Sequence, residues 1–247
     1  GRDGIFSNAS SNSIYRGNVM RDLRFAVHFM YTRNTEVSGN ISIGNHLGFA
    51  IMFSNQAKIL SNISLGDRDH GLMLNYANNA DVTGNLVRGG TKKCLFIYNA
   101  HKNLVWNNRF EGCGIGIHFT AGSEKNALTG NAFIANREQV KYVGTRNMEW
   151  SHGRRGNFWS DHPAFDLNGD GIADIAHGFM CQGAPSAHLH RGAVLGMHHP
   201  AADQIADAVR LQLLAQQHVD DAGHRLRLLD VDLPDLGMGV RAAHEGR

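Results

Sequence analysis

The sequence predicts an all-β protein built mainly as a right-handed parallel β-helix, a solenoid of about six rungs between about Ser11 and Asn147. Three regularities lead to this prediction. A Gly-Asn, Ser-Asn or Asn-Asn step recurs every 22 or 23 residues, a short strand pattern precedes it, and a longer alternating segment follows after about nine residues. This period leaves no room for a helix of ordinary length beside the strands, which argues against leucine-rich and ankyrin-type repeats.

The recurring asparagines are expected to stack along the solenoid. Asparagine tolerates the left-handed turn conformation, and its side-chain amide can hydrogen-bond the same amide one rung away, at about 4.8 Å. The pattern therefore predicts a structural ladder at this turn. Its six members are Asn18, Asn40, Asn62, Asn85, Asn108 and Asn131.

The longer segments alternate with period two, which is typical of strands with one buried face. We expect their inward side chains to stack from rung to rung and to form the core. The predicted inward positions are Phe25, Val27, Phe29, Phe49, Ile51, Phe53, Leu72, Leu74, Tyr76, Cys94, Phe96, Tyr98, Ile115, Ile117, Phe119, Val140 and Tyr142.

Bulk properties exclude several classes of protein. The formal net charge is only +2 and no lysine-arginine stripe is present, which argues against a nucleic-acid partner. No run of about 18 apolar residues could cross a bilayer, so the chain is not expected to be transmembrane. The cysteines, Cys94, Cys113 and Cys181, predict neither a disulfide framework nor a Cys-x-x-Cys metal site.

The rungs are assigned to residues 1–150 and an irregular C-terminal cap to residues 151–177. Within the cap, oxygen-bearing residues at alternate positions followed by a glycine form a calcium-loop pattern. The candidate ligands are Asp166, Asn168, Asp170, Asp174 and the backbone carbonyl of Ile172. His177 stands where an EF-hand has its bidentate glutamate, so the loop is not an EF-hand. The alternative is an acidic turn without metal that closes the solenoid.

Two distinctive motifs follow the last rung. They read Gly156-Asn157-Phe158-Trp159-Ser160-Asp161-His162-Pro163 and Asp166-Leu167-Asn168-Gly169-Asp170-Gly171-Ile172-Ala173-Asp174. Together with the rungs, they make residues 1–174 resemble the NosD family, periplasmic β-helix proteins of the CASH type that assist copper-site maturation of nitrous-oxide reductase. Family members continue with a small residue, a proline and a tyrosine, whereas this chain has Ile175-Ala176-His177, so the resemblance ends there.

The resemblance implies a periplasmic location and copper as the metal. It also implies three partners: an ABC-type transporter, a copper chaperone and nitrous-oxide reductase. Phe158 and Trp159 of the first motif are expected to pack into the core of the cap.

Soft donor side chains occupy the outward columns of the long strands. One predicted column contains Met30, Met52, Asn75, Ile97 and Thr120, and its neighbour contains His28, Ala50, Met73, Leu95 and His118. Thioether and imidazole groups suit Cu(I), so the candidate copper ligands are Met30, Met52, Met73, His28 and His118. His118 lies two rungs beyond Met73, about 10 Å away, so all five cannot share one ion. The alternative is an apolar patch that another segment or a partner covers.

The tail, residues 178–247, is left unassigned because its composition changes abruptly. Asparagine, lysine, tyrosine and tryptophan vanish, while histidine, arginine and alanine are frequent. Three interpretations stay open: a shifted reading frame with no native fold, an accessory or linker region, and a metal-binding tail. The histidines of the third interpretation are His188, His190, His198 and His199.

The leading functional hypothesis is a non-enzymatic periplasmic protein that assists copper delivery to nitrous-oxide reductase. The second is a β-helix that binds or cleaves polysaccharide, which requires two carboxylates on one face. Asp67 and Asp69 are the close pair within the rungs, but Arg68 between them favours a salt-bridged turn. The third is a structural or adhesive solenoid, which would bind no metal.

Overall fold

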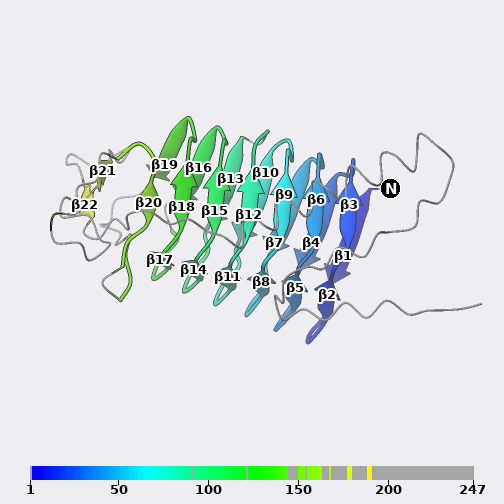
Figure 1. The fold of residues 1–247 in the computed structure, drawn as a ribbon. Helices are drawn as coiled ribbons and strands as arrows, with labels where there is room; N and C mark the ends of the chain where they lie inside the picture. The colour runs from blue at the N-terminus through cyan, green and yellow to red at the C-terminus, as the bar shows by residue number, and fades with distance from the viewer. Residues whose placement is uncertain are drawn as a thin grey trace, which may run out of the picture. The chain divides into compact units, whose positions relative to one another are not determined.

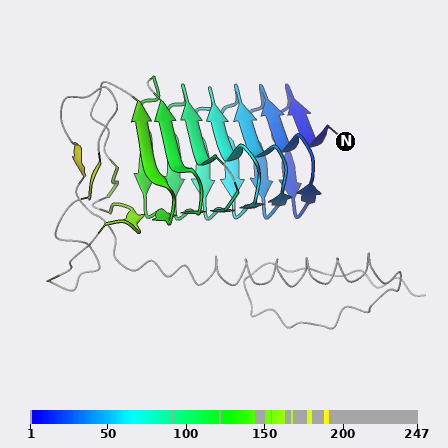
Figure 2. The ribbon, with the colours of Figure 1, turned by 90° about the horizontal axis from the view of Figure 1, so that it is seen from above.

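The computed structural model describes residues 2–90, 92–120, 122–143, 150–153, 155–162, 167, 177–179 and 188–190. Among these residues every regular element is a β-strand, and three parallel sheets wind into a solenoid of about six turns. Figure 1 and Figure 2 show the strands of successive coils side by side. The predicted all-β solenoid is therefore confirmed.

Each coil contributes one long strand and two short ones. The long-strand sheet contains β1 (Asp3–Asn8), β4 (Phe25–Met30), β7 (Leu47–Met52), β10 (His70–Asn75), β13 (Lys93–Tyr98), β16 (Ile115–Thr120) and β19 (Glu138–Val143). The second sheet contains β2 (Ile14–Arg16), β5 (Glu36–Ser38), β8 (Lys58–Leu60), β11 (Asp81–Thr83), β14 (Leu104–Trp106) and β17 (Ala127–Thr129). The third sheet contains β3 (Val19–Arg21), β6 (Ile41–Ile43), β9 (Ile63–Leu65), β12 (Leu86–Arg88), β15 (Arg109–Glu111), β18 (Ala132–Ile134) and β20 (Phe158–Trp159).

Two short strands of the tail pair with each other. They are β21 (His177–Phe179) and β22 (His188–His190), and their pairing is antiparallel. The five candidate calcium ligands, Asp166, Asn168, Asp170, Ile172 and Asp174, lie outside the described residues.

The repeated asparagines lie above one another between the second and third sheets. The backbone N–H and the side-chain Nδ2 of each asparagine donate to Oδ1 of the next, at 2.9–3.1 Å. Asn157, which the prediction did not include, accepts from Asn131 and extends the row to a seventh position. Asn40, Asn62, Asn85, Asn108, Asn131 and Asn157 are almost completely buried, so these bonds satisfy backbone groups that water cannot reach.

A second row of polar side chains, which the sequence did not predict, lies at the turn before the long strands. The N–H of Leu23 donates to Asn45 Oδ1 at 2.8 Å, that of Asn45 to Asp67 Oδ1 at 2.8 Å, and that of Cys113 to Asn136 Oδ1 at 2.9 Å. Asp67 thus takes an asparagine's place inside the solenoid. Its other oxygen accepts from the hydroxyls of Ser42 and Ser64, each at 2.6 Å.

Burial raises the pKa of Asp67, although the donors from Ser42, Ser64 and Asn45 oppose the shift. The pKa of Asp67 is therefore higher in the folded protein than in the unfolded chain. At a pH below the unfolded-state pKa the carboxyl group is protonated in both states, so its burial as a charge costs no stability there. The cost develops as the pH rises through the folded-state pKa. We expect Asp67→Asn to raise the melting temperature at pH 7 by about 2–4 °C, the shift that about 1 kcal/mol gives in a chain of this size. Thermal unfolding followed by circular dichroism between pH 3.5 and 7 measures this difference in melting temperature. If the difference does not become smaller toward low pH, the charge of Asp67 is not its cause.

The core between the sheets corrects the predicted interior. The long-strand sheet contributes Val27, Phe29, Phe49, Ile51, Leu72, Leu74, Leu95, Ile97, Ile117, Phe119, Val140 and Tyr142. Leu95 and Ile97, predicted to face outward, are fully buried. The prediction is wrong for six residues that lie outside the core cluster: Phe25, Phe53, Tyr76, Phe96, Tyr98 and Ile115.

Phe53 and Tyr76 lie just after β7 and β10, where the backbone turns with φ of 49° and 50°. A bend near the start of each long strand explains the other four errors. The register passes from Phe25↔Leu47 directly to Val27↔Phe49 and skips one residue per strand. In six of the seven long strands the skipped position holds a small residue: Gly4, Ala26, Gly48, Gly71, Cys94 and Gly116; in β19 it holds Gln139. At Gly71 a Cβ atom would overlap the side chain of Val87. Because the bend interrupts the period-two alternation, a simple alternating pattern assigns the wrong face.

Cys94 and Cys113 form a single disulfide in the core, which the sequence, read as giving no disulfide framework, did not predict. Their Cα atoms lie 5.7 Å apart although 19 residues separate them in the chain. Both residues are buried. The bond joins β13 to the turn before β16 and thus links consecutive coils.

Aromatic side chains close the C-terminal end of the described solenoid. Trp159 stacks on Phe133 with ring centroids 4.5 Å apart, and Phe133 stacks on Phe110 at 5.2 Å. Trp150 packs edge-on against Trp159 and Phe119 at 6.1 and 6.0 Å. Trp159 is 3% exposed and belongs to the core, as predicted, whereas Phe158 is half-buried and lies outside the core cluster.

Candidate functional site

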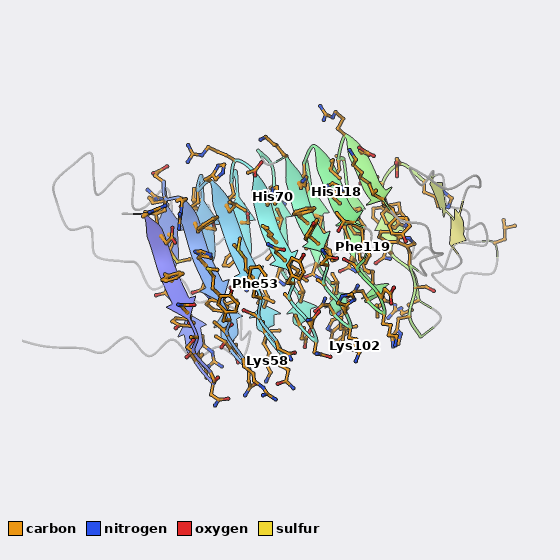
Figure 3. All side chains as sticks on the ribbon, turned by 180° about the vertical axis from the view of Figure 1, so that it is seen from behind. Phe53, Lys58, His70, Lys102, His118 and Phe119 are labelled. Atoms are coloured by element: carbon orange, nitrogen blue, oxygen red, sulfur yellow. A yellow bond between two sulfur atoms is a disulfide. The ribbon has the colours of Figure 1, made fainter. Side chains whose placement is uncertain are left out.

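The outer surface of the long-strand sheet brings the predicted soft donors onto one face. One row of register partners contains His28, Ala50, Met73, Phe96 and His118, and the neighbouring row contains Met30, Met52, Asn75 and Tyr98. Phe96 and Tyr98 occupy the places that the sequence assigned to Leu95 and Ile97. Figure 3 shows this sheet with His70 and His118 on strands β10 and β16.

Four of the five candidate ligands surround Ala50. His28 and Met73 are its direct partners on the two flanking strands, Met52 lies two residues farther along β7, and Met30 lies diagonally on β4. With strands about 4.8 Å apart and about 3.3 Å per residue, the four backbone positions lie within about 8 Å of Ala50. We call His28, Met30, Met52 and Met73 the methionine cluster.

Ala50 has the smallest side chain at the centre of this cluster. It is fully buried, yet it is not part of the core cluster, so outer side chains cover it. The three methionines are half-buried. A methyl group flanked by long, flexible thioethers leaves those sulfurs free to converge above it.

His28 has one satisfied and one unsatisfied ring nitrogen. Its Nδ1 lies 3.1 Å from Asp3 Oδ2, whereas its Nε2 is buried without a hydrogen-bond partner. The rings of Phe6 and Phe25 flank the imidazole with centroids 5.1 and 4.6 Å away. The residue is 7% exposed. Buried polar atoms are normally paired, so the unpartnered Nε2 makes His28 a candidate ligand; His70 Nδ1, His118 Nδ1 and Asn75 Oδ1 on the same sheet are also buried without a partner.

His118 lies apart from the methionine cluster. Phe96 stands between it and Met73 in the register, and the rings of Phe96 and His118 are 5.1 Å apart. Burial lowers the pKa of His118 to about 4, with the charges of Lys93 and Lys141 adding to the effect. The structure thus groups four of the candidates and separates the fifth.

His70 also belongs to this face. It lies on β10, is 8% exposed, and packs edge-on against Phe96 with centroids 5.0 Å apart. Burial lowers its pKa, and its Nδ1 lies 3.4 Å from Asp69 Oδ2 without hydrogen-bond geometry. It lies directly before the skipped position Gly71, so the strand bend places it on the outer face.

An exposed aromatic row runs beside the methionine cluster. Tyr31 stacks on Phe53 and Phe53 on Tyr76, with centroids 5.2 and 5.1 Å apart, and Tyr98 contacts Tyr76 edge-on at 5.8 Å. Phe53, labelled in Figure 3, is 40% exposed. Because these rings cover one another's faces, they offer mainly edges, which is a poor arrangement for stacking against sugars.

The carboxylates considered for polysaccharide cleavage do not share a face. Asp67 is fully buried inside the turn row, whereas Asp69 pairs with Lys92 at 3.0 Å on the outside. Asp69 does form an ion pair, but the partner shown is Lys92 and not the predicted Arg68, and the salt-bridge prediction is wrong for Asp67, which accepts from Ser42 and Ser64.

Across the part of the chain that the structure describes, no three His, Cys, Asp or Glu side chains form a metal-binding group. The donors that gather on the long-strand sheet are instead three thioethers and one imidazole. The described residues contain no helix that is long and apolar enough to span a membrane.

Comparison with known proteins gives one family and two relatives. The model of the family described as periplasmic copper-binding protein (NosD) matches residues 1–164. A protein of Stutzerimonas stutzeri named probable ABC transporter binding protein NosD is 43% identical over 52% of this chain and 33% of its own length. One of the same name from Pseudomonas aeruginosa is 40% identical over 50% of this chain and 32% of its own length. The chain thus spans about a third of the length of these relatives.

Proposed function

The chain belongs to the NosD family of periplasmic copper-binding proteins, and from this we propose that it carries Cu(I) on the outer face of its long-strand sheet for the maturation of nitrous-oxide reductase. It acts as a non-enzymatic accessory protein. The observation that carries the proposal is the buried, unpartnered Nε2 of His28, on a sheet face that also holds Met30, Met52 and Met73 at neighbouring register positions.

The donor set selects the metal. Thioether sulfur and neutral imidazole are soft ligands that favour Cu(I) over Zn(II), Ca²⁺ or Mg²⁺. The ligands in this proposal are His28, Met30, Met52 and Met73. His118 is excluded because the Phe96 ring lies between it and Met73, whereas only the methyl group of Ala50 lies between Met73 and His28.

The openness of the site suits a carrier. The three methionines are half-buried on an exposed sheet face, so incoming ligands can replace them one at a time without unfolding the coils. Copper is the cargo in this scheme: it arrives from a copper chaperone and leaves toward nitrous-oxide reductase. The names of both relatives support an association with an ABC-type transporter.

A disulfide in the core, as well as the family, supports a location in the periplasm. The Cys94–Cys113 disulfide joins consecutive coils, and such bonds persist in oxidising compartments such as the bacterial periplasm.

Anaerobic titration of the full chain against a chromophoric Cu(I) chelator tests this function. We expect one equivalent of Cu(I) to bind, Ag(I) to compete for the same site, and Zn(II) to leave the Cu(I) affinity unchanged. The matched variant His118→Ala should bind with the wild-type affinity. A chain that binds no Cu(I), or that loses binding on replacement of His118, would favour the structural solenoid or a different site.

A further inference from the structure

We propose that Asp3 is a positioning residue for the copper site: its carboxylate holds the proton of His28 on Nδ1 and thereby keeps the Nε2 lone pair available to the methionine cluster. This inference rests on the proposed function. It assigns a role to a residue on β1 that contributes no ligand of its own.

The geometry around His28 supports this assignment. The imidazole has two tautomers, and the group that accepts from one ring nitrogen decides which nitrogen is left free. Asp3 Oδ2 lies 3.1 Å from Nδ1, and both side chains are 9% exposed. A carboxylate accepts and does not donate, so the proton belongs on Nδ1. Nε2 is then a buried acceptor without a partner.

Arg24 fixes the carboxylate from its other side. Its Nε donates to Asp3 Oδ1 at 2.8 Å and its Nη2 to Oδ2 at 2.6 Å, a two-point contact that fixes the plane of the carboxylate. The guanidinium also lies 4.5 Å from the ring centroid of Phe25, which packs against His28. The imidazole is thus held by a hydrogen bond at one edge and by aromatic rings on its sides.

Carboxylates that orient metal-bound histidines act in this way in many proteins. They fix the tautomer, raise the basicity of the ligating nitrogen, and their loss weakens metal binding by about 10–100-fold. Arg24, Asp3 and His28 are arranged in the same way, with Nε2 as the ring nitrogen left for a metal.

A simpler role for Asp3 would be to pair with Arg24 and stabilise the first coil. Three variants separate the two roles. Asp3→Leu removes the hydrogen-bond acceptor with a side chain of similar size. Asp3→Asn keeps the shape of the side chain, but its NH₂ group must face either Arg24 or His28. Arg24→Gln removes the ion pair and leaves Asp3 beside His28. Circular dichroism establishes that each variant folds.

Nitrogen-15 NMR of the histidines in the metal-free chain reads the tautomer directly. We expect His28 in the wild type and in Arg24→Gln to be protonated on Nδ1. In Asp3→Leu the Nε2-protonated form should become dominant, with Asp3→Asn intermediate. In the chelator competition, Asp3→Leu should bind Cu(I) about 10–100-fold more weakly than the wild type, and Arg24→Gln within about threefold of it.

A tautomer that survives Asp3→Leu, or an unchanged Cu(I) affinity once the tautomer is lost, would overturn the proposal. If Asp3→Leu does not fold, the same two readouts on Asp3→Asn decide. If the wild type binds no Cu(I), the proposed function fails. The NMR result then still establishes whether Asp3 sets the tautomer, so the two failures can be told apart.

Discussion

Replacing Asn85 by alanine is expected to lower the free energy of unfolding by about 3 kcal/mol or more. The Asn85 side chain accepts from the backbone and the side chain of Asn62, and its Nδ2 donates to Ile59 O and to Asn108 Oδ1. These groups are buried, and each unsatisfied one costs about 1–3 kcal/mol. The corresponding fall in melting temperature is about 6–12 °C, which thermal unfolding followed by circular dichroism measures.

Asn55→Ala is the matched control for this prediction. Asn55 is exposed, and its side chain accepts one hydrogen bond, from Asn79 Nδ2 at 2.8 Å. A surface change of this kind is worth about 0.5 kcal/mol or less. Equal melting temperatures for the two variants would mean that burial of the asparagine row contributes no special stability.

Replacing Met30, Met52 and Met73 together by leucine should weaken Cu(I) binding by about 100-fold or more, a change of about 3 kcal/mol in binding free energy. Leucine retains the apolar volume and removes the sulfur, so only the donor chemistry changes. Because the three side chains lie outside the core and are half-buried, we expect the melting temperature to stay close to that of the wild type. Chelator competition and thermal unfolding on the same samples measure both quantities.

Met20→Leu serves as the control for this triple variant. Met20 is 6% exposed and belongs to the core cluster, so its sulfur is not accessible to an ion on the sheet face. Its replacement should leave Cu(I) affinity unchanged. Undiminished binding by the triple variant would exclude the methionine cluster as the copper site.

The coil period and the asparagine positions could be predicted because a solenoid converts spacing along the chain into neighbourhood in space. The same spacing placed Met30 and Met52 in adjacent strands, as the register has them. Asn157 escaped the prediction because 26 residues, more than the usual period, separate it from Asn131.

Two features could not be predicted from the period-two alternation alone: which residues of the long strands face the core, and the contact of Asp3 with His28. One skipped residue per long strand reversed the faces assigned to Leu95 and Phe96. The recurrent small residues at Gly48, Gly71 and Gly116 carried a signal for that bend. Asp3 and His28 are 25 residues apart, which is more than the coil period of 22 or 23 residues, so the period did not bring them together.

The closing aromatic residues also give the solenoid an optical reporter at one end. Of the three tryptophans in the chain, Trp150 and Trp159 are buried in that closure, while Trp106 is 39% exposed. Fluorescence emission therefore follows mainly the state of the last coils, whereas the circular dichroism of the peptide groups follows all of them. Comparing the two signals during denaturation distinguishes a chain that unzips from this end from one that unfolds in a single step.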